Sequence, residues 1–346
     1  MTLGRVGYLL YHRPIGRLQT CIREGGPIEQ WKTERGRRAM EQSAYGLTAP
    51  VAGVSWSPSD PSRKLGCGLL VKGGENSSLA TSHTSLESGG KPLEVHVLTG
   101  KYFWYQTAFC LWSLAKASRR EVLPLIYDDG SMKPEHLAYF EERFPNGEVV
   151  RQEEIVARLD RFLPASKFPR LRERWLHYPN IRKLTDPHAG EHGWKLVVDS
   201  DLLFFRSPDV LLRWADSPER PLHAIDSETS YGYPLDEMSA LAGHQVVERL
   251  NVGLCGLKSK SIDWEQLEYW CEELISKHGT HYYLEQALVA MMVAGKDCAV
   301  LSPDDYVTLP REPEASGCKA VMHHYVSSSK PWYFRTNWQR VLSINS

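Results

Sequence analysis

The segment LVVDSDLLFF, residues 196–205, carries two aspartates one residue apart within an apolar run. The apolar residues before Asp199 predict a buried strand. In an extended chain, side chains at i and i+2 point to the same side, so Asp199 and Asp201 can approach one point. Two close carboxylates repel each other unless a cation lies between them, and their oxygens suit Mg²⁺ or Mn²⁺. The segment therefore predicts a strand ending at a divalent-metal site, although a turn cap or an ion pair with Arg206 explains the two aspartates equally well.

The sequence around this segment alternates between strand and helix patterns from residue 93 onward. Tyr105, Phe109 and Trp112 recur at helical spacing and predict one apolar helix face. Asp263 and Gln266 predict a helix cap. Such alternation predicts an α/β fold with a mostly parallel sheet covered by helices on both faces, and ligands of such sheets bind beyond the carboxyl ends of the strands. Strands are expected at 93–98, 122–130, 194–201, 222–225, 251–257 and 320–325, and helices at 134–144, 208–215 and 283–294.

Composition divides the chain into three parts. Residues 1–45 are charged and predict a small helical N-terminal extension, most clearly at 29–44. Residues 46–92 are rich in Gly, Ser, Thr and Pro, the composition of a linker or loop. Residues 93–346 hold the alternating pattern and are expected to form the main domain.

Whole-chain properties exclude several classes of protein. The chain has 346 residues, 42% of them apolar, and a formal charge of −1, which argues against a nucleic-acid partner. Its seven cysteines include no C-x-x-C pair, so a zinc-thiolate site is not indicated. No apolar stretch of about 18 residues is present to predict an integral membrane segment. We expect a folded, cytoplasmic protein.

A third candidate metal ligand lies in VMHHYVSSSKPWYF, residues 321–334. A neutral imidazole from His324 together with two carboxylates makes a site compatible with Mn²⁺. Lys330, six residues later, can neutralise phosphate oxygens. Taken alone, the histidine is better explained by a place in the core or on the surface, and the lysine by a solvated surface.

The order of these motifs resembles a known family. D-x-D after a strand, then N-x-G at Asn251 and Gly253, then an acid–Gln pair, then H-x5-KPW is similar to the retaining glycosyltransferases typified by glycogenin and the bacterial lipopolysaccharide galactosyltransferases. The resemblance covers roughly 93–335. It implies a GT-A fold, Mn²⁺ or Mg²⁺, a nucleotide-sugar donor, usually a UDP-sugar, and a saccharide, lipid-linked or protein acceptor.

The resemblance also implies roles for individual residues. It implies metal ligands at Asp199, Asp201 and His324, donor contacts at Lys183, Ser200, Asn251, Gly253, Lys330 and Trp332, and catalytic roles for Glu285, Gln286 and Lys330. For the nucleoside, our candidates are Thr99, either Tyr102 or Tyr105, and Asp128, although each tyrosine is explained equally by packing and Asp128 by a turn.

Two departures from the family pattern stand out. The family's H-F-x-G is His324-Tyr325-Val326-Ser327 here, so a glycine with free backbone geometry is missing. Its usual first-strand ending is replaced by TGKYFWY, residues 99–105. These departures leave open a catalytically silent nucleotide-sugar-binding protein, and the paired aspartates alone also suit a metal-dependent nucleotidyltransferase or phosphoesterase.

Overall fold

The structure is a computed structural model that describes residues 26–47 and 90–343. Residues 1–25 of the predicted extension, and nearly all of the predicted linker at 46–92, lie outside the described residues. In the part of the chain that is described, no helix is both long and apolar enough to cross a membrane.

A seven-stranded sheet forms the centre of the protein, in the order β3-β2-β1-β4-β7-β6-β8. β7 runs antiparallel to both of its neighbours, and every other pair in this sheet is parallel. The predicted α/β fold with a mostly parallel sheet is therefore confirmed. The strands are β1 (Leu93–Thr99), β2 (Val122–Asp128), β3 (Glu148–Val150), β4 (Trp194–Val198), β6 (Leu222–Ile225), β7 (Leu250–Lys258) and β8 (Ala299–Val300).

A second, three-stranded sheet lies beside the first. It consists of β5 (Leu202–Phe204), β10 (Met322–His324) and β9 (Tyr306–Thr308), in that order. β10 pairs antiparallel with β5, so His324 lies opposite Leu202. Since β5 follows β4 after only three residues, the segment 199–201 joins the two sheets.

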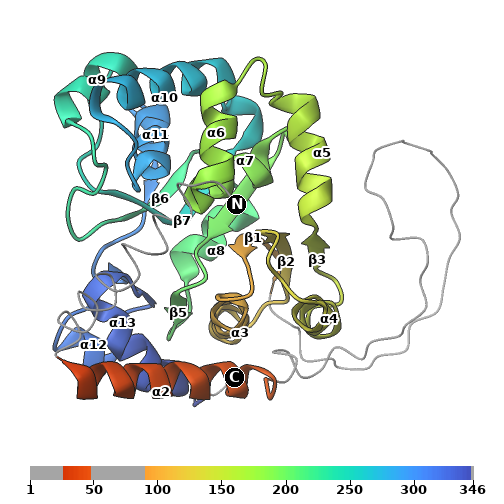
Figure 1. Ribbon diagram of the computed structural model, residues 1–346. Coiled ribbons are helices and arrows are strands. Elements are labelled where there is room, and N and C mark those ends of the chain that lie inside the picture. Colours follow the sequence, from red (N-terminus) through yellow and green to blue (C-terminus); the bar gives the residue numbers. More distant parts are fainter. Residues whose placement is uncertain (1–25, 48–89, 344–346) are drawn as a thin grey trace, which may run out of the picture.

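Helices cover both faces of the large sheet, as predicted (Figure 1). One buried cluster lies between the sheet and one group of helices, and a second cluster lies on the opposite face. The first face carries α2 (Pro27–Ala44), α3 (Trp104–Ser118), α4 (Pro134–Arg143), α8 (Asp209–Asp216) and α14 (Trp338–Val341). The second carries α5 (Gln152–Phe162), α6 (Pro169–His177), α7 (Arg182–His188), α9 (Leu235–Ala242), α10 (Trp264–His278) and α11 (Leu284–Val293).

Helix α10 begins as its sequence predicts. Asp263 Oδ1 accepts a hydrogen bond from the backbone N–H of Gln266 at 3.0 Å, which satisfies one of the free donors of the first turn. Leu267, Trp270, Cys271 and Leu274 form the buried stripe of this helix.

Helix α3 differs from its prediction, because it is buried nearly all round rather than on one face. Every residue from Trp104 to Ser118 except Lys116 is buried. The reason is tertiary: α3 lies between the sheet strands β1 and β2 on one side and α2 and β5 on the others. A helix enclosed in this way has no solvent-facing stripe.

Helix α2 packs against the C-terminal part of the described chain, along the π-helix η5 (Tyr333–Asn337) (Figure 1). Gly36 lies so close to the backbone of Phe334 that an added Cβ would overlap the Phe334 carbonyl oxygen. Arg335 donates to Thr33 Oγ1 at 2.8 Å and to Glu29 Oε2 at 2.6 Å. Met40 and Ala44 belong to the first buried cluster, so α2 is part of the core.

Candidate functional site

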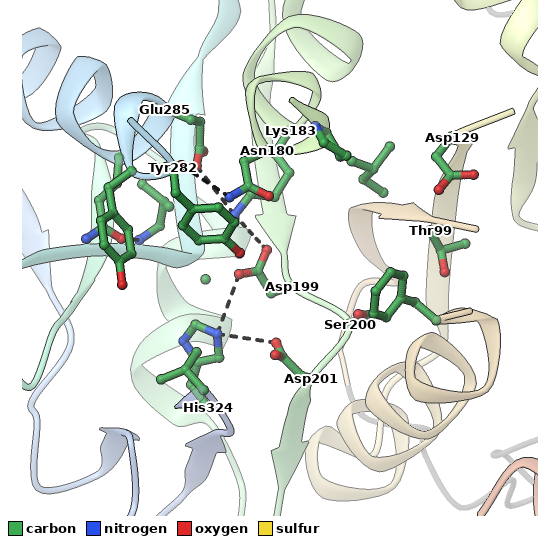
Figure 2. A pocket seen from close by; sticks show the side chains of 18 residues that line it. Thr99, Asp129, Asn180, Lys183, Asp199, Ser200, Asp201, Tyr282, Glu285 and His324 are labelled. Atoms are coloured by element: carbon green, nitrogen blue, oxygen red, sulfur yellow. Dashed lines mark hydrogen bonds and ion pairs between the residues drawn. The ribbon is translucent and has the colours of Figure 1, made fainter. Parts of the chain in front are cut away.

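The two aspartates and the histidine expected to bind a metal lie together where the two sheets meet. Asp199, Asp201 and His324 each offer a ligand atom, and these atoms lie within 4.8 Å of one another. Among the described residues, no other group of three possible ligands was found. His324 Nε2 lies 3.5 Å from Asp199 Oδ2 and 3.3 Å from Asp201 Oδ1 (Figure 2).

The sequence predicted that both aspartates lie in an extended strand, and this prediction is wrong. β4 ends at Val198 and β5 begins at Leu202, and a turn between them holds both carboxylates. Two backbone bonds fix this turn: Asp199 N–H donates to the Gly253 carbonyl at 2.7 Å, and Tyr325 N–H donates to the Asp201 carbonyl at 3.0 Å. The turn is therefore attached to β7 on one side and to the residue after β10 on the other.

These three side chains fit a divalent ion. His324 Nε2 is buried and makes no hydrogen bond, although the carboxylate oxygens surround it. Two carboxylates and one imidazole are a ligand set suited to Mn²⁺ and Mg²⁺. A divalent cation bound by all three groups would give this nitrogen a partner and balance both carboxylates.

Two lysines flank the cluster and balance its negative charge. Lys183, in α7, lies 2.8 Å from Asp199 Oδ1 and 3.5 Å from Glu285 Oε2. Lys330 donates to Asp201 Oδ2 at 2.6 Å from the other side. The side chains of Lys183 and Glu285 are only 12% and 7% exposed, so this ion pair is largely shielded from solvent.

The buried charges shift one another's pKa values. Burial opposes the charge on His324, but Asp201 and Asp199 outweigh it and raise the His324 pKa to about 9. Burial would raise the pKa of Asp201, yet Lys330 and His324 hold it well below its usual range. Burial raises the pKa of Glu285 to about 7 despite the nearby Lys183. Glu285 can therefore gain or lose a proton near neutral pH.

The cluster lines a cavity of about 250 Å³ beyond the carboxyl ends of β1 and β4. The cavity brings together most of the predicted site residues, from the first strand to the last. Those that line it are Thr99, Lys183, Asp199, Ser200, Asp201, Gly253, Glu285, Gln286 and His324.

Six predicted site residues do not line the cavity, and one of them, Tyr102, is 59% exposed. Tyr105 is buried in the first core cluster, and Trp332 packs against the same cluster. Asp128 Oδ1 accepts from the backbone N–H groups of residues 130, 131 and 132, so it shapes the turn after β2. Asn251 lies behind the cavity wall, hydrogen-bonded to His324, and Lys330 reaches the site through Asp201.

Several cavity residues were not predicted from the sequence. Asp129 lines the cavity where Asp128 was expected, and Asn180 lies near Lys183 (Figure 2). Phe103, Tyr282 and Tyr283 add aromatic side chains, all at least one-third exposed. These residues lie in turns and helix ends that carry no motif, although the Tyr282-Tyr283 pair, separated from Glu285 by one residue, was a visible signal.

The position that lacks the family's glycine keeps a glycine-like backbone. Ser327 has a φ of 44°, in the left-handed region that favours glycine. It begins the 3₁₀ helix η4 (Ser327–Ser329), which leads directly into Lys330. The missing glycine therefore does not abolish the turn between His324 and Lys330.

Comparisons with solved structures find low similarity to several glycosyltransferases. Mouse xyloside xylosyltransferase 1 is 13% identical, with a TM-score of 0.47 over 68% of this chain and 98% of that chain. The galactosyltransferase LgtC, in complex with donor and acceptor sugar analogues, is 12% identical, with a TM-score of 0.46 over 73% and 95%. GlyE from Streptococcus pneumoniae is 13% identical, with a TM-score of 0.43 over 73% and 62%. No protein-family model and no curated sequence matches the chain. Similarity this low does not transfer an activity.

Proposed function

We propose that the protein is a metal-dependent glycosyltransferase that moves a sugar from a nucleotide-sugar to an acceptor hydroxyl, with retention at the anomeric carbon. The family resemblance favours a UDP-sugar as the donor. The observation that carries the proposal is the set of Asp199, Asp201 and His324 in a cavity wall, with Lys183 and Lys330 beside it. This arrangement suits a substrate that carries a diphosphate.

Asp199, Asp201 and His324 would hold the divalent ion, Mn²⁺ or Mg²⁺, through two carboxylates and one imidazole nitrogen. A bound ion supplies positive charge beside the diphosphate that departs when the glycosidic bond breaks. The aspartates, paired with lysines before any ligand binds, already have their charge partly balanced. The protein can therefore keep both carboxylates ionised in a partly buried wall.

Lys330 is the group that we assign to the leaving diphosphate. It lies 2.6 Å from Asp201 on the side of the cluster away from Lys183. Negative charge on the diphosphate grows as the bond to the sugar breaks, so a fixed ammonium group there stabilises the transition state more than the bound donor. Lys330 is 28% exposed, which leaves its side chain room to move from Asp201 to a phosphate.

Glu285 is the group that we assign to the sugar. It lines the cavity and is tied by Lys183 to Asp199, which places a carboxylate beside the metal cluster. When ionised, it would stabilise positive charge that develops on the sugar ring. Because the donor phosphate itself can accept the acceptor's proton, retention needs no separate strong base.

The proposal is tested by titration calorimetry of nucleotide-sugars with and without Mn²⁺, using wild type and Asp201→Asn. Wild type should bind one donor only with Mn²⁺, and the variant should lose that binding with its fold intact. Asp304→Asn, which changes an exposed aspartate, is the matched control. Unchanged donor affinity in Asp201→Asn contradicts the proposal.

Product analysis with the donor found in this way then separates the alternatives. Sugar transfer or donor hydrolysis supports a glycosyltransferase. Transfer of a phosphoryl or nucleotidyl group would indicate a nucleotidyltransferase, and binding without turnover would indicate a silent binding protein.

A further inference from the structure

Asp226 is a buried carboxylate that no motif identified. It follows β6 directly, at the same edge of the sheet as Asp199, and is 8% exposed. Its Oδ1 accepts from Ser227 N–H at 2.7 Å. Its Oδ2 accepts from Asn251 Nδ2 at 3.0 Å and from Gln286 Nε2 at 3.1 Å. Both oxygens are therefore occupied by donors inside the protein.

The carboxylate fixes the orientation of the Asn251 side chain. An ionised carboxylate only accepts hydrogen bonds, so the amide NH₂ of Asn251 must face Asp226 and its Oδ1 must face away. That oxygen accepts from Gly253 N–H at 2.9 Å and lies 3.1 Å from His324 Nδ1. With its amide turned this way, Asn251 offers His324 only an acceptor.

An acceptor at Nδ1 decides which nitrogen of the neutral imidazole carries the proton. His324 Nδ1 must carry a proton to donate to Asn251, so in the neutral ring the lone pair is on Nε2. Nε2 is the nitrogen that faces Asp199 and Asp201 without a hydrogen bond. The network thus presents to the metal position the one nitrogen that can ligate.

Gln286 belongs to the same network. Its Nε2 donates to Asp226 and to the Ser230 carbonyl at 2.9 Å, and its Oε1 accepts from Val252 N–H at 3.4 Å. Both amide hydrogens are therefore used within the protein. Gln286 ties α11 to the start of β7, next to Asn251.

We propose that Asp226 is a positioning residue that, through Asn251 and with Gln286 beside it, holds the His324 ring with Nδ1 toward Asn251 and Nε2 toward the two aspartates. In this arrangement Asn251 contacts the proposed metal ligand His324 directly, and Gln286 helps to hold Asp226. The inference rests on the proposed metal site, but the hydrogen bond that it describes exists without metal.

The first measurement needs no metal. The proton on His324 Nδ1 should be visible in ¹H–¹⁵N NMR spectra of the metal-free protein, because burial and the bond to Asn251 protect it from exchange. Asn251→Ala, or Asn251→Ser if the alanine variant does not fold, should lose the signal. An unchanged signal in these variants overturns the proposal.

The second measurement is Mn²⁺ affinity by calorimetry. Asp226→Asn keeps the shape of the side chain but places an NH₂ group among three N–H donors. The hydrogen bond that orients Asn251 is then weakened, and the affinity for Mn²⁺ should fall about 10- to 100-fold. In the Asn251→Ala background the same change should have little further effect, because Asp226 acts through Asn251. Asp186→Asn, at another buried aspartate, should leave the affinity unchanged.

The outcomes separate this inference from the proposed function. Additive losses in the double variant, or wild-type affinity in a folded Asp226→Asn protein, overturn the network while leaving the metal site in place. If wild type binds no divalent ion, the proposed function fails, and the NMR signal alone decides the role of Asn251.

Discussion

Gly253 lies against the imidazole of His324, with no room for a side chain between them. A Cβ on Gly253 would overlap Cε1 and Nδ1 of the ring. The glycine of the N-x-G motif is therefore needed for the close approach of His324, the proposed metal ligand, independently of any contact with a donor.

Gly253→Ala should weaken Mn²⁺ binding about 10-fold or more, because the ring must move away from the aspartates and misplaced ligands cost affinity of this order. Calorimetric titration with Mn²⁺ measures the effect. Gly193→Ala is the matched control, since a Cβ there meets nothing within 4 Å. Equal affinities in the two variants would show that the ring adjusts without loss.

Lys330→Met should lower kcat on the order of 100-fold, about 3 kcal/mol, with a smaller change in KM. The methionine keeps much of the side-chain packing and removes the charge that we assign to the leaving diphosphate. Steady-state turnover of the donor, with hydrolysis as the readout if no acceptor is known, measures this. Lys319→Met, at an exposed lysine, should behave as wild type. A kcat within about twofold of wild type would rule out Lys330 as the partner of the leaving group.

Ser327→Gly should raise the free energy of unfolding by roughly 0.5 kcal/mol. Relief of a left-handed backbone is worth about 1–2 kcal/mol, and the greater freedom of glycine in the unfolded chain offsets about 0.4–1 kcal/mol of it. Urea denaturation measures the change. The neighbouring Ser328 has no positive φ, so Ser328→Gly should instead destabilise the protein. The same sign in both variants would show that the backbone at Ser327 is not strained.

Asp186→Asn should change how stability depends on pH. Burial raises the pKa of Asp186 to about 6, although Trp175 and Thr185 donate hydrogen bonds to it. The folded protein thus binds this proton more tightly than the unfolded chain, so the contribution is stabilising at low pH and is lost as the pH rises through about 6. The stability of wild type minus that of the variant should fall by roughly 2 kcal/mol between about pH 4 and pH 7. A pH-independent difference in urea denaturation would contradict this.

The sequence predicted those parts of the fold and site that are written in local patterns. The strands at 93–98 and 222–225 and the cap at Asp263 follow from periodicity and composition, and the structure confirms them. The grouping of Asp199, Asp201 and His324 was predicted from the two aspartates at i, i+2 and from the order of later motifs. The structure brings Asp201 and His324 together although they are 123 positions apart in the sequence (324 − 201).

The remainder depends on contacts that local patterns do not encode. Strands β5 and β9 have only three residues each, too few to establish a period. The burial of α3 on all sides depends on where α2 packs. Asp226 had no motif, and its importance follows only from the three N–H donors and the Ser227 hydroxyl that the fold places around it.

The contact between α2 and η5 joins residues that are about 300 positions apart in the sequence, as the pairing of Glu29 with Arg335 illustrates (306 positions). A protease that cut the chain anywhere in 48–89 would break the covalent link between α2 and the rest of the chain. The contacts of Gly36 with Phe334, and of Thr33 and Glu29 with Arg335, would still hold α2 in place. The two fragments would then elute together under native conditions and part only in denaturant. Loss of α2 itself would instead remove the packing partner of η5, which begins three residues after Lys330.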